Sequence, residues 1–237
     1  MDDMFTRTRL LLGDGAVEKL KQAHVAVFGL GGVGGACAEA LCRAGVGALT
    51  LVDHDTISVT NLNRQLLATR ETLGMDKVEA AAARLGSINP DCRVTARRTF
   101  FLPETADEFD FADYDCVVDA VDTVTAKLLL VERARAAGTP IVCAMGAGNK
   151  LDPTAFRVAD ISETRICPLA RVMRKELRKR GIERGVKVVY SAEPPVEIER
   201  EAAEGPRQKD VPGSVSFVPG VMGMILAGEA VKDLISF

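Results

Sequence analysis

The first segment whose spacing predicts chemistry is a glycine-rich run at residues 29–34, which reads Gly-Leu-Gly-Gly-Val-Gly. It fits the pattern G-x-G-x-x-G and lies between a predicted strand and a predicted helix, the context in which this pattern binds phosphate. Glycines let the backbone approach a phosphate, and the helix N-terminus offers unpaired N–H groups to the negative charge. The residues expected to contact a nucleotide here are Gly29, Gly31, Gly32 and Gly34.

Asp53 supports a nucleotide as the ligand. It follows Gly29 by 24 residues and ends the second predicted strand, where its carboxylate can accept hydrogen bonds from ribose hydroxyls. The glycine run and Asp53 alone predict a Rossmann-like site, and they leave a nicotinamide or flavin cofactor open.

Charged and amide side chains after Asp53 favour ATP over those cofactors. The segment 61–65 reads Asn-Leu-Asn-Arg-Gln, and Lys77 opens the next predicted helix, so cations and amides lie near the phosphate-binding end of the sheet. Hydride transfer does not need such cations, whereas they would neutralise a triphosphate and stabilise the charge that develops at its α-phosphate when pyrophosphate leaves. The residues expected around the ligand are Asp53, Asp55, Asn61, Arg64, Gln65 and Lys77.

Asp122 is a candidate metal ligand. It follows the predicted strand at 116–120 and emerges at the same carboxyl edge of the sheet, where a magnesium ion would bind carboxylate and phosphate oxygens. Each residue alone has a simpler interpretation, with Arg64 or Lys77 as a solvated surface charge and Asp122 as a cap of the following helix. If these side chains do not converge, a nicotinamide-dependent oxidoreductase or a nucleotide-sensing module is the alternative.

The elements that must position these residues alternate through the first 145 residues. Short continuous apolar runs predict strands, and the periodic stretches between them predict helices. The strands are expected at 25–29, 49–53, 116–120 and 141–145, and the helices at 33–43, 77–88 and 125–137. Continuous apolar strands separated by helices predict a mostly parallel sheet covered on both faces, which is a Rossmann-like, doubly wound α/β fold.

The composition changes after Gly146. The expected elements are strands at 155–159 and 186–191, a helix that begins at Pro168, a mobile polar loop at 193–213, a segment at 214–218 and an apolar helix at 221–234. The last two return to the core. We therefore expect a single domain, in which 1–150 form a nucleotide-binding core and 151–237 form a substrate-binding extension.

The composition is that of a soluble globular protein, with 47% hydrophobic residues and a mean hydropathy of +0.10. The acidic start has no apolar segment behind it, and charged residues interrupt the apolar stretch 217–237, so we expect a cytoplasmic protein without membrane contact. Six cysteines without a C-x-x-C pair, and only two histidines, argue against a closed zinc site. We interpret the cysteines as buried, reduced thiols and single out Cys167 for closer inspection.

A basic segment at 165–187 contrasts with the net charge of −3 of the whole chain. It contains nine Lys or Arg residues and two Glu, so its formal charge is +7 and that of the remaining chain is −10. Helical spacing gathers four of the basic side chains into one stripe, while Leu169, Val172, Met173 and Leu177 can face the body. A phosphate backbone fits this stripe, and an ordinary solvated face is the simpler alternative. The stripe consists of Arg171, Arg174, Lys175 and Arg178, with Lys179 beside it.

Together these motifs resemble the ubiquitin-activating-like adenylyltransferase superfamily of the ThiF and MoeB type, which includes the activating proteins of molybdopterin and thiamine biosynthesis. The resemblance covers nearly all of the first 150 residues and is carried by the glycine run, Asp53-x-Asp55, the segment 61–65, Gly74-x-x-Lys77 and Asp122. It implies that ATP and Mg²⁺ are the cofactors.

The resemblance also implies roles for individual residues. Asp53 would hold the ribose, and Asn61, Arg64 and Lys77 would hold the phosphates. Asp122 would bind magnesium and be essential for catalysis. Arg7 would reach into the ATP site of a second subunit, so that a homodimer would be required for activity.

Within the superfamily, members that activate sulfur-carrier proteins typically bear paired C-x-x-C zinc ligands and often a thiol in a late crossover loop. This chain has no such pair and no cysteine after Cys167. Residues 5–13, 145–150, 168–171 and 177–181 instead resemble the branch that dehydrates threonylcarbamoyladenosine in tRNA.

In that branch, ATP activates the carboxylate of the threonylcarbamoyl group, and the acyl adenylate cyclises with net loss of water. An internal nucleophile closes the ring, so Cys167 is not expected to act as a nucleophile. The resemblance implies tRNA as the partner of the basic stripe, and a sulfur-transfer protein is a further candidate partner. Adenylation of the C-terminus of a ubiquitin-like or sulfur-carrier protein remains the alternative activity.

Overall fold

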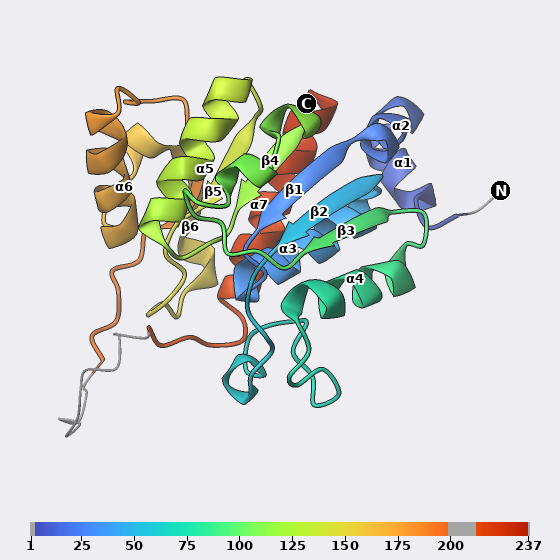
Figure 1. Ribbon diagram of the computed structural model, residues 1–237, viewed down its shortest axis with the longest axis horizontal. Coiled ribbons are helices and arrows are strands. Elements are labelled where there is room, and N and C mark those ends of the chain that lie inside the picture. The colour runs from blue at the N-terminus through green and yellow to red at the C-terminus, as the bar shows by residue number, and fades with distance from the viewer. Residues whose placement is uncertain (1–2, 199–211, 237) are drawn as a thin grey trace.

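The computed structural model describes residues 3–198 and 212–236, which form a seven-stranded sheet of order β3-β2-β1-β4-β5-β7-β6 (Figure 1). All neighbouring strands are parallel except β6 and β7, which are antiparallel. The strands are β1 (His24–Phe28), β2 (Ala48–Val52), β3 (Arg93–Arg97), β4 (Cys116–Asp119), β5 (Ile141–Ala144), β6 (Phe156–Asp160) and β7 (Lys187–Ser191). This order confirms the expected doubly wound α/β class.

Helices cover both faces of the sheet. The α-helices are α1 (Thr6–Leu12), α2 (Asp14–Gln22), α3 (Gly32–Ala44), α4 (Lys77–Ile88), α5 (Val124–Ala137), α6 (Pro168–Lys179) and α7 (Pro219–Ile235). Short 3₁₀ turns are η1 (Val59–Asn61), η2 (Ala106–Glu108), η3 (Phe111–Asp113), η4 (Pro153–Ala155) and η5 (Ile161–Glu163). In Figure 1, α3, α4 and α7 lie on one side of the sheet, and α5 and α6 lie on the other.

The core has two halves because side chains of a strand alternate between the faces of a sheet. In β1, Val25 and Val27 pack with α3, α4 and α7, whereas Ala26 and Phe28 pack with α5 and α6. The Phe28 ring centroid lies 4.9 Å from that of Phe101, within a cluster of phenylalanines on the second face. Buried strands with both faces covered explain the continuous apolar runs in the sequence.

Predicted and observed elements agree to within one or two residues where both exist. The sequence reasoning missed α1, α2 and β3. In β3 the alternation Arg-Val-Thr-Ala-Arg at the sheet edge has no apolar run, and most of its side chains are exposed. Of the expected loop 193–213, residues 199–211 lie outside the described residues, and the described remainder has no regular secondary structure.

In the described part of the chain, none of the helices combines the length and apolar character needed to cross a membrane.

Candidate active site

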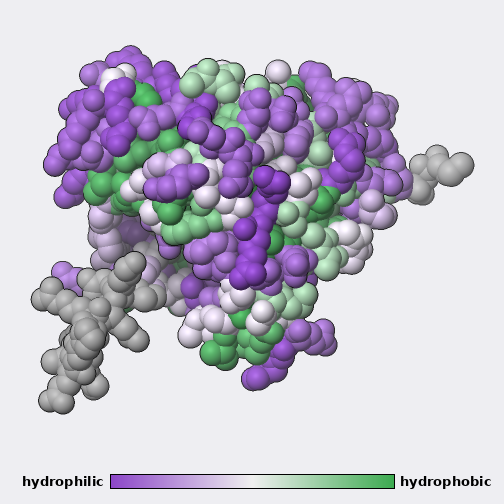
Figure 2. All heavy atoms as spheres, in the orientation of Figure 1, coloured by the Kyte–Doolittle hydropathy of each residue, from purple (hydrophilic) through white to green (hydrophobic). Residues whose placement is uncertain are grey.

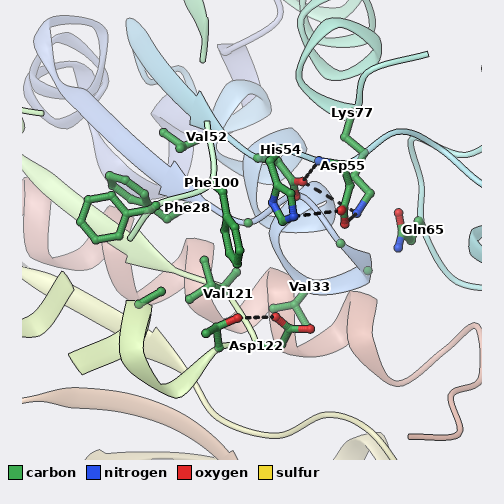
Figure 3. A pocket seen from close by; sticks show the side chains of 18 of the residues that line it. Phe28, Val33, Val52, His54, Asp55, Gln65, Lys77, Phe100, Val121 and Asp122 are labelled. Atoms are coloured by element: carbon green, nitrogen blue, oxygen red, sulfur yellow. Dashed lines mark hydrogen bonds and ion pairs between the residues drawn. The ribbon is translucent and has the colours of Figure 1, made fainter. Parts of the chain in front are cut away.

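A cavity of about 280 Å³ opens at the carboxyl edge of the sheet, among the loops that follow β1, β2, β3 and β4 (Figure 3). The expected ligand-binding residues that line it are Gly29, Gly31, Gly32, Asp53, Asp55, Asn61, Arg64, Gln65, Lys77 and Asp122. Gly34 and Arg7 do not line it. Of the residues expected in the cavity of their own chain, only Gly34 is therefore absent, and Arg7 was expected in the cavity of a second subunit.

Two glycines of the run allow close backbone packing, and another leaves space for a ligand. Gly29 has φ +87°, and a Cβ atom there would lie 2.7 Å from the Ala120 carbonyl oxygen. A Cβ atom at Gly34 would lie 1.8 Å from the Gly29 carbonyl oxygen, so the start of α3 can approach β1 only without a side chain. At Gly31 the nearest atom is Gln65 Nε2 at 3.9 Å, and this glycine leaves space for a ligand.

Asp53, directly after β2, is held by the backbone on both sides. Its Oδ2 accepts from the Leu30 N–H at 2.6 Å, and its Oδ1 accepts from the Asp55 N–H at 2.9 Å. The carboxylate therefore connects the glycine run to the loop after β2. Asp53 also lines the cavity, where its oxygens could accept a further hydrogen bond from a ribose hydroxyl.

Lys77, the first residue of α4, is only 5% exposed, so the alternative of a solvated surface charge is wrong for it. Its Nζ lies 2.6 Å from Asp55 Oδ2 and 3.9 Å from Asp53 Oδ1. An ammonium group that is largely shielded from water acts strongly on a nearby phosphate, because the local dielectric constant is low.

Arg64 and Asn61 are tied to their own loop. Arg64 Nη1 donates to the Thr60 carbonyl oxygen and to Asn63 Oδ1, both at 2.9 Å. Asn61 Oδ1 accepts from the Ser58 N–H at 3.0 Å. Both side chains line the cavity, with the Arg64 guanidinium held by these bonds rather than free in solvent.

Gln65 is the one described side chain with a fully buried polar atom that has no hydrogen-bond partner. The residue is 6% exposed, and the atom is Oε1. A buried amide oxygen without a partner costs about 1–3 kcal/mol. Gln65 also lines the cavity, where its Nε2 is the atom nearest to the Cβ position of Gly31.

Asp122 lies across the cavity from Asp55 (Figure 3). It accepts from Thr123 Oγ1 at 3.3 Å. The N-cap of α5 is Thr123 and no side chain caps this helix, so the interpretation of Asp122 as a helix cap is wrong. Among the described residues no cation pairs with its carboxylate, which is therefore available to a ligand.

Asp53, His54 and Asp55 form a second group of potential metal ligands, with atoms within 4.8 Å of one another. The Lys77 ammonium already lies 2.6 Å from one of these carboxylates and partly neutralises the group. A divalent ion there would have to compete with this ammonium for the carboxylates. The Asp122 carboxylate, with which no cation pairs among the described residues, fits a hard cation such as Mg²⁺ better.

An aromatic wall of the cavity was not predicted from the sequence. The rings of His54 and Phe100 stack with centroids 4.0 Å apart and an interplanar angle of 18°. In Figure 3, the Phe100 ring lies between His54 and Val121. The only signal was the Phe100-Phe101 pair, whose position depends on the strand β3 that the sequence did not reveal.

The five basic residues of α6 form a second, shallow hollow of about 380 Å³ on the opposite flank. The hydrophilic surface over α6 is visible at the upper left of Figure 2. Arg174 Nη1 donates to the Thr164 carbonyl oxygen at 2.7 Å and so has a structural role. The expectation that Val172 faces the body is wrong: it is 42% exposed, because it lies on the outer side of α6 from the buried Met173 and Leu177.

Cys167 and Arg7 lie away from the cavity. Cys167 is buried at the N-cap of α6, and Arg7 is exposed on α1. Because α2 directly precedes β1, α1 and α2 pack near the amino edge of the sheet, opposite the cavity (Figure 1). Arg7 therefore has no role in the cavity of its own chain.

The chain matches known proteins over nearly its whole length. A sequence model of the ThiF family matches residues 5–237. A tRNA threonylcarbamoyladenosine dehydratase from Bacillus subtilis is 43% identical over 239 residues, covering 98% of this chain and 94% of the relative. The crystal structure of Escherichia coli tRNA N6-threonylcarbamoyladenosine dehydratase in complex with ATP matches with a TM-score of 0.88 and 35% identity, covering 98% of this chain and 94% of that chain.

A more distant relative bears on the alternative activity. An adenylyltransferase and sulfurtransferase, uba4, from Aspergillus niger is 32% identical over 90% of this chain, but this alignment covers only 40% of the relative.

Proposed function

The chain belongs to the ThiF family, and we propose that it uses ATP to adenylate the threonylcarbamoyl carboxylate of a tRNA adenosine, which then cyclises with net loss of water. The observation that carries this proposal is the cavity in which the buried Lys77 ammonium and the Asp122 carboxylate face the same space beside the glycine run. The near-complete alignment with tRNA threonylcarbamoyladenosine dehydratases supports threonylcarbamoyladenosine in tRNA as the substrate.

The reaction has two steps. A carboxylate oxygen of the threonylcarbamoyl group attacks the α-phosphorus of ATP, and pyrophosphate leaves. A nucleophilic atom within the same group then attacks the activated carbonyl carbon, AMP leaves with the original carboxylate oxygen, and a proton is lost. No enzyme thiol takes part, which accords with the burial of Cys167.

The side chains that line the cavity have different roles in these two steps. Asp53 binds the ribose hydroxyls, and Lys77 and Arg64 stabilise the charge that grows on the phosphates as pyrophosphate leaves. Asn61 donates hydrogen bonds from its amide group to the phosphates. Asp122 would hold Mg²⁺, which when bound would neutralise phosphate oxygens and assist departure of pyrophosphate.

The aromatic wall suits the base of ATP. The wall of His54, Phe100 and Val121 offers flat apolar surface to the cavity. Purine bases stack on aromatic rings with about 1–3 kcal/mol per base. The base therefore lies against Phe100 while the phosphates lie along the glycine run.

The basic stripe of α6 supplies the tRNA contact. Arg171, Lys175, Arg178 and Lys179 are exposed, so they can neutralise backbone phosphates without losing internal partners, except that Lys179 pairs with Glu176 at 2.8 Å. Arg174 contributes less, because its guanidinium is bound to Thr164.

A homodimer completes the site in this proposal. Leu10 and Leu11 of α1 are 83% and 86% exposed, an apolar surface that a second copy would cover. Arg7 lies on the same short helix and would enter the cavity of the second copy. A sulfur-transfer protein as an additional partner is a separate hypothesis, which co-purification with this chain would test.

The test is mass spectrometry of tRNA nucleosides after incubation of modified tRNA with the purified protein and ATP. Loss of one water from threonylcarbamoyladenosine, dependent on ATP, is the expected result. Unchanged nucleosides with a protein that binds ATP would contradict the proposal.

The alternative is adenylation of the C-terminus of a ubiquitin-like or sulfur-carrier protein, favoured by the resemblance to uba4. Pyrophosphate exchange into ATP distinguishes the two activities. Exchange that requires modified tRNA and ignores carrier proteins excludes the alternative, and the reverse dependence would support it.

A further inference from the structure

An ion pair between Asp119 and Lys127 is completely buried behind the cavity. Both side chains are 0% exposed, and Lys127 Nζ donates to both carboxylate oxygens of Asp119, at 2.9 and 2.8 Å. Neither residue lines the cavity. Because burying two charges costs several kcal/mol per ion, an apolar pair of similar volume is often equally stable or more stable. The stability of the fold alone therefore does not account for the pair.

The pair closes the turn that carries Asp122. Asp119 is the last residue of β4, and Lys127 lies in the first turn of α5, so the turn 120–123 runs between them. Asp119 Oδ1 also accepts from the Val121 N–H at 3.2 Å, and the Lys127 N–H donates to the Thr123 carbonyl oxygen at 3.0 Å. Both ends of the turn are thus anchored to the same buried pair.

Ala120, the first residue of the turn, is fixed by its neighbours, whereas the Asp122 side chain has few contacts. The Ala120 N–H donates to the Phe28 carbonyl oxygen at 2.8 Å, and Ala120 packs on Gly29. Asp122, in contrast, has one weak hydrogen bond, from Thr123 Oγ1 at 3.3 Å. The direction of the Asp122 carboxylate is therefore set by the backbone of the turn.

We propose that Lys127 is a positioning residue, which through Asp119 holds the turn 120–123 so that the Asp122 carboxylate faces the bound nucleotide. This inference rests on the proposed function, in which Asp122 holds the metal ion beside ATP. A displacement of about 1 Å in a catalytic group can lower a rate by about 10²-fold. Loss of the pair therefore lowers kcat by about that factor, while the KM for ATP changes little because Lys77 and Phe100 are untouched.

The experiment removes both charges together with Asp119→Asn and Lys127→Met, so that neither charge is left buried without a partner. The Asn oxygen still accepts from the Val121 N–H. The expected result is a folded protein with a near-normal KM for ATP and a kcat that is about 10²-fold lower. A folded double variant with the kcat of the wild type would overturn the inference.

The same double replacement in an Asp122→Ala background separates positioning from a general structural effect. If the pair acts through Asp122, it should cause no further loss of kcat there. A further loss of similar size would overturn the inference. If Asp122→Ala alone retains kcat, the proposed role of Asp122 fails; if it lowers kcat and the double replacement does not, only the positioning role fails.

A matched control removes a different ion pair. Glu39 of α3 accepts from Arg84 of α4 at 2.6 Å, away from the cavity, so Glu39→Gln with Arg84→Met should leave kcat unchanged. Should the Asp119/Lys127 double variant fail to fold, Asp119→Asn with Lys127→Gln, which also leaves no buried charge without a partner, is measured in the same cycle. Wild-type kcat in that variant would likewise overturn the inference.

Discussion

Replacing Asp122 by alanine tests the site most directly. The side chain is exposed at the cavity and has one hydrogen bond of 3.3 Å, so its removal should change the free energy of unfolding by no more than about 0.5 kcal/mol. Loss of metal-assisted charge stabilisation should lower kcat by a factor of about 10²–10⁴, which corresponds to about 3–5 kcal/mol in the activation free energy. The Asp122→Ala protein should therefore lose activity and keep its stability.

The assay follows conversion of modified tRNA by mass spectrometry at saturating ATP, alongside thermal unfolding of the same preparations. Asp113→Ala, which removes an exposed carboxylate outside the cavity, is the matched control and should retain full activity. Wild-type turnover in a folded Asp122→Ala protein would refute the proposed role of Asp122, because the other described carboxylates that line the cavity lie beside the Lys77 ammonium.

Three further changes probe other parts of the molecule. Phe100→Ala should raise the KM for ATP by about tenfold, as lost base stacking predicts, and an unchanged KM would remove the base from the aromatic wall. Reversal of charge at Arg171 and Arg178 should raise the KM for tRNA and weaken its salt dependence without affecting ATP; unaltered tRNA binding would leave the stripe a solvated face. Gly34→Ala should lower the melting temperature strongly, since its Cβ would lie 1.8 Å from a carbonyl oxygen, whereas Gly15→Ala in α2, with open space around it, should not; equal melting temperatures would contradict the tight packing of α3.

Local pattern predicted most of the sheet. Buried strands such as β1 and β4 are continuous apolar runs, and the helices between them have clear periodicity, so their positions follow from short segments of sequence. The edge strand β3 could not be predicted from the sequence, because exposed residues such as Arg93 and Arg97 leave it without an apolar run. Because β3 was not predicted, the position of Phe100, three residues beyond the strand, could not be predicted either.

The sequence by itself determined which residue types line the cavity. Covalent order places the glycine run, Asp53 and Asp122 directly after parallel strands, and the carboxyl ends of such strands share one edge of the sheet. That rule needs no side-chain detail, and the cavity contains the expected residues.

Only the tertiary structure decided how these residues are held. The burial of Lys77 against Asp55, the stacking of His54 on Phe100 and the enclosed pair of Asp119 and Lys127 are contacts through space. Each pair joins two different elements or loops, so no single helix or strand periodicity relates its members, and each contact depends on how those elements pack. Spacing in the sequence therefore could not reveal them.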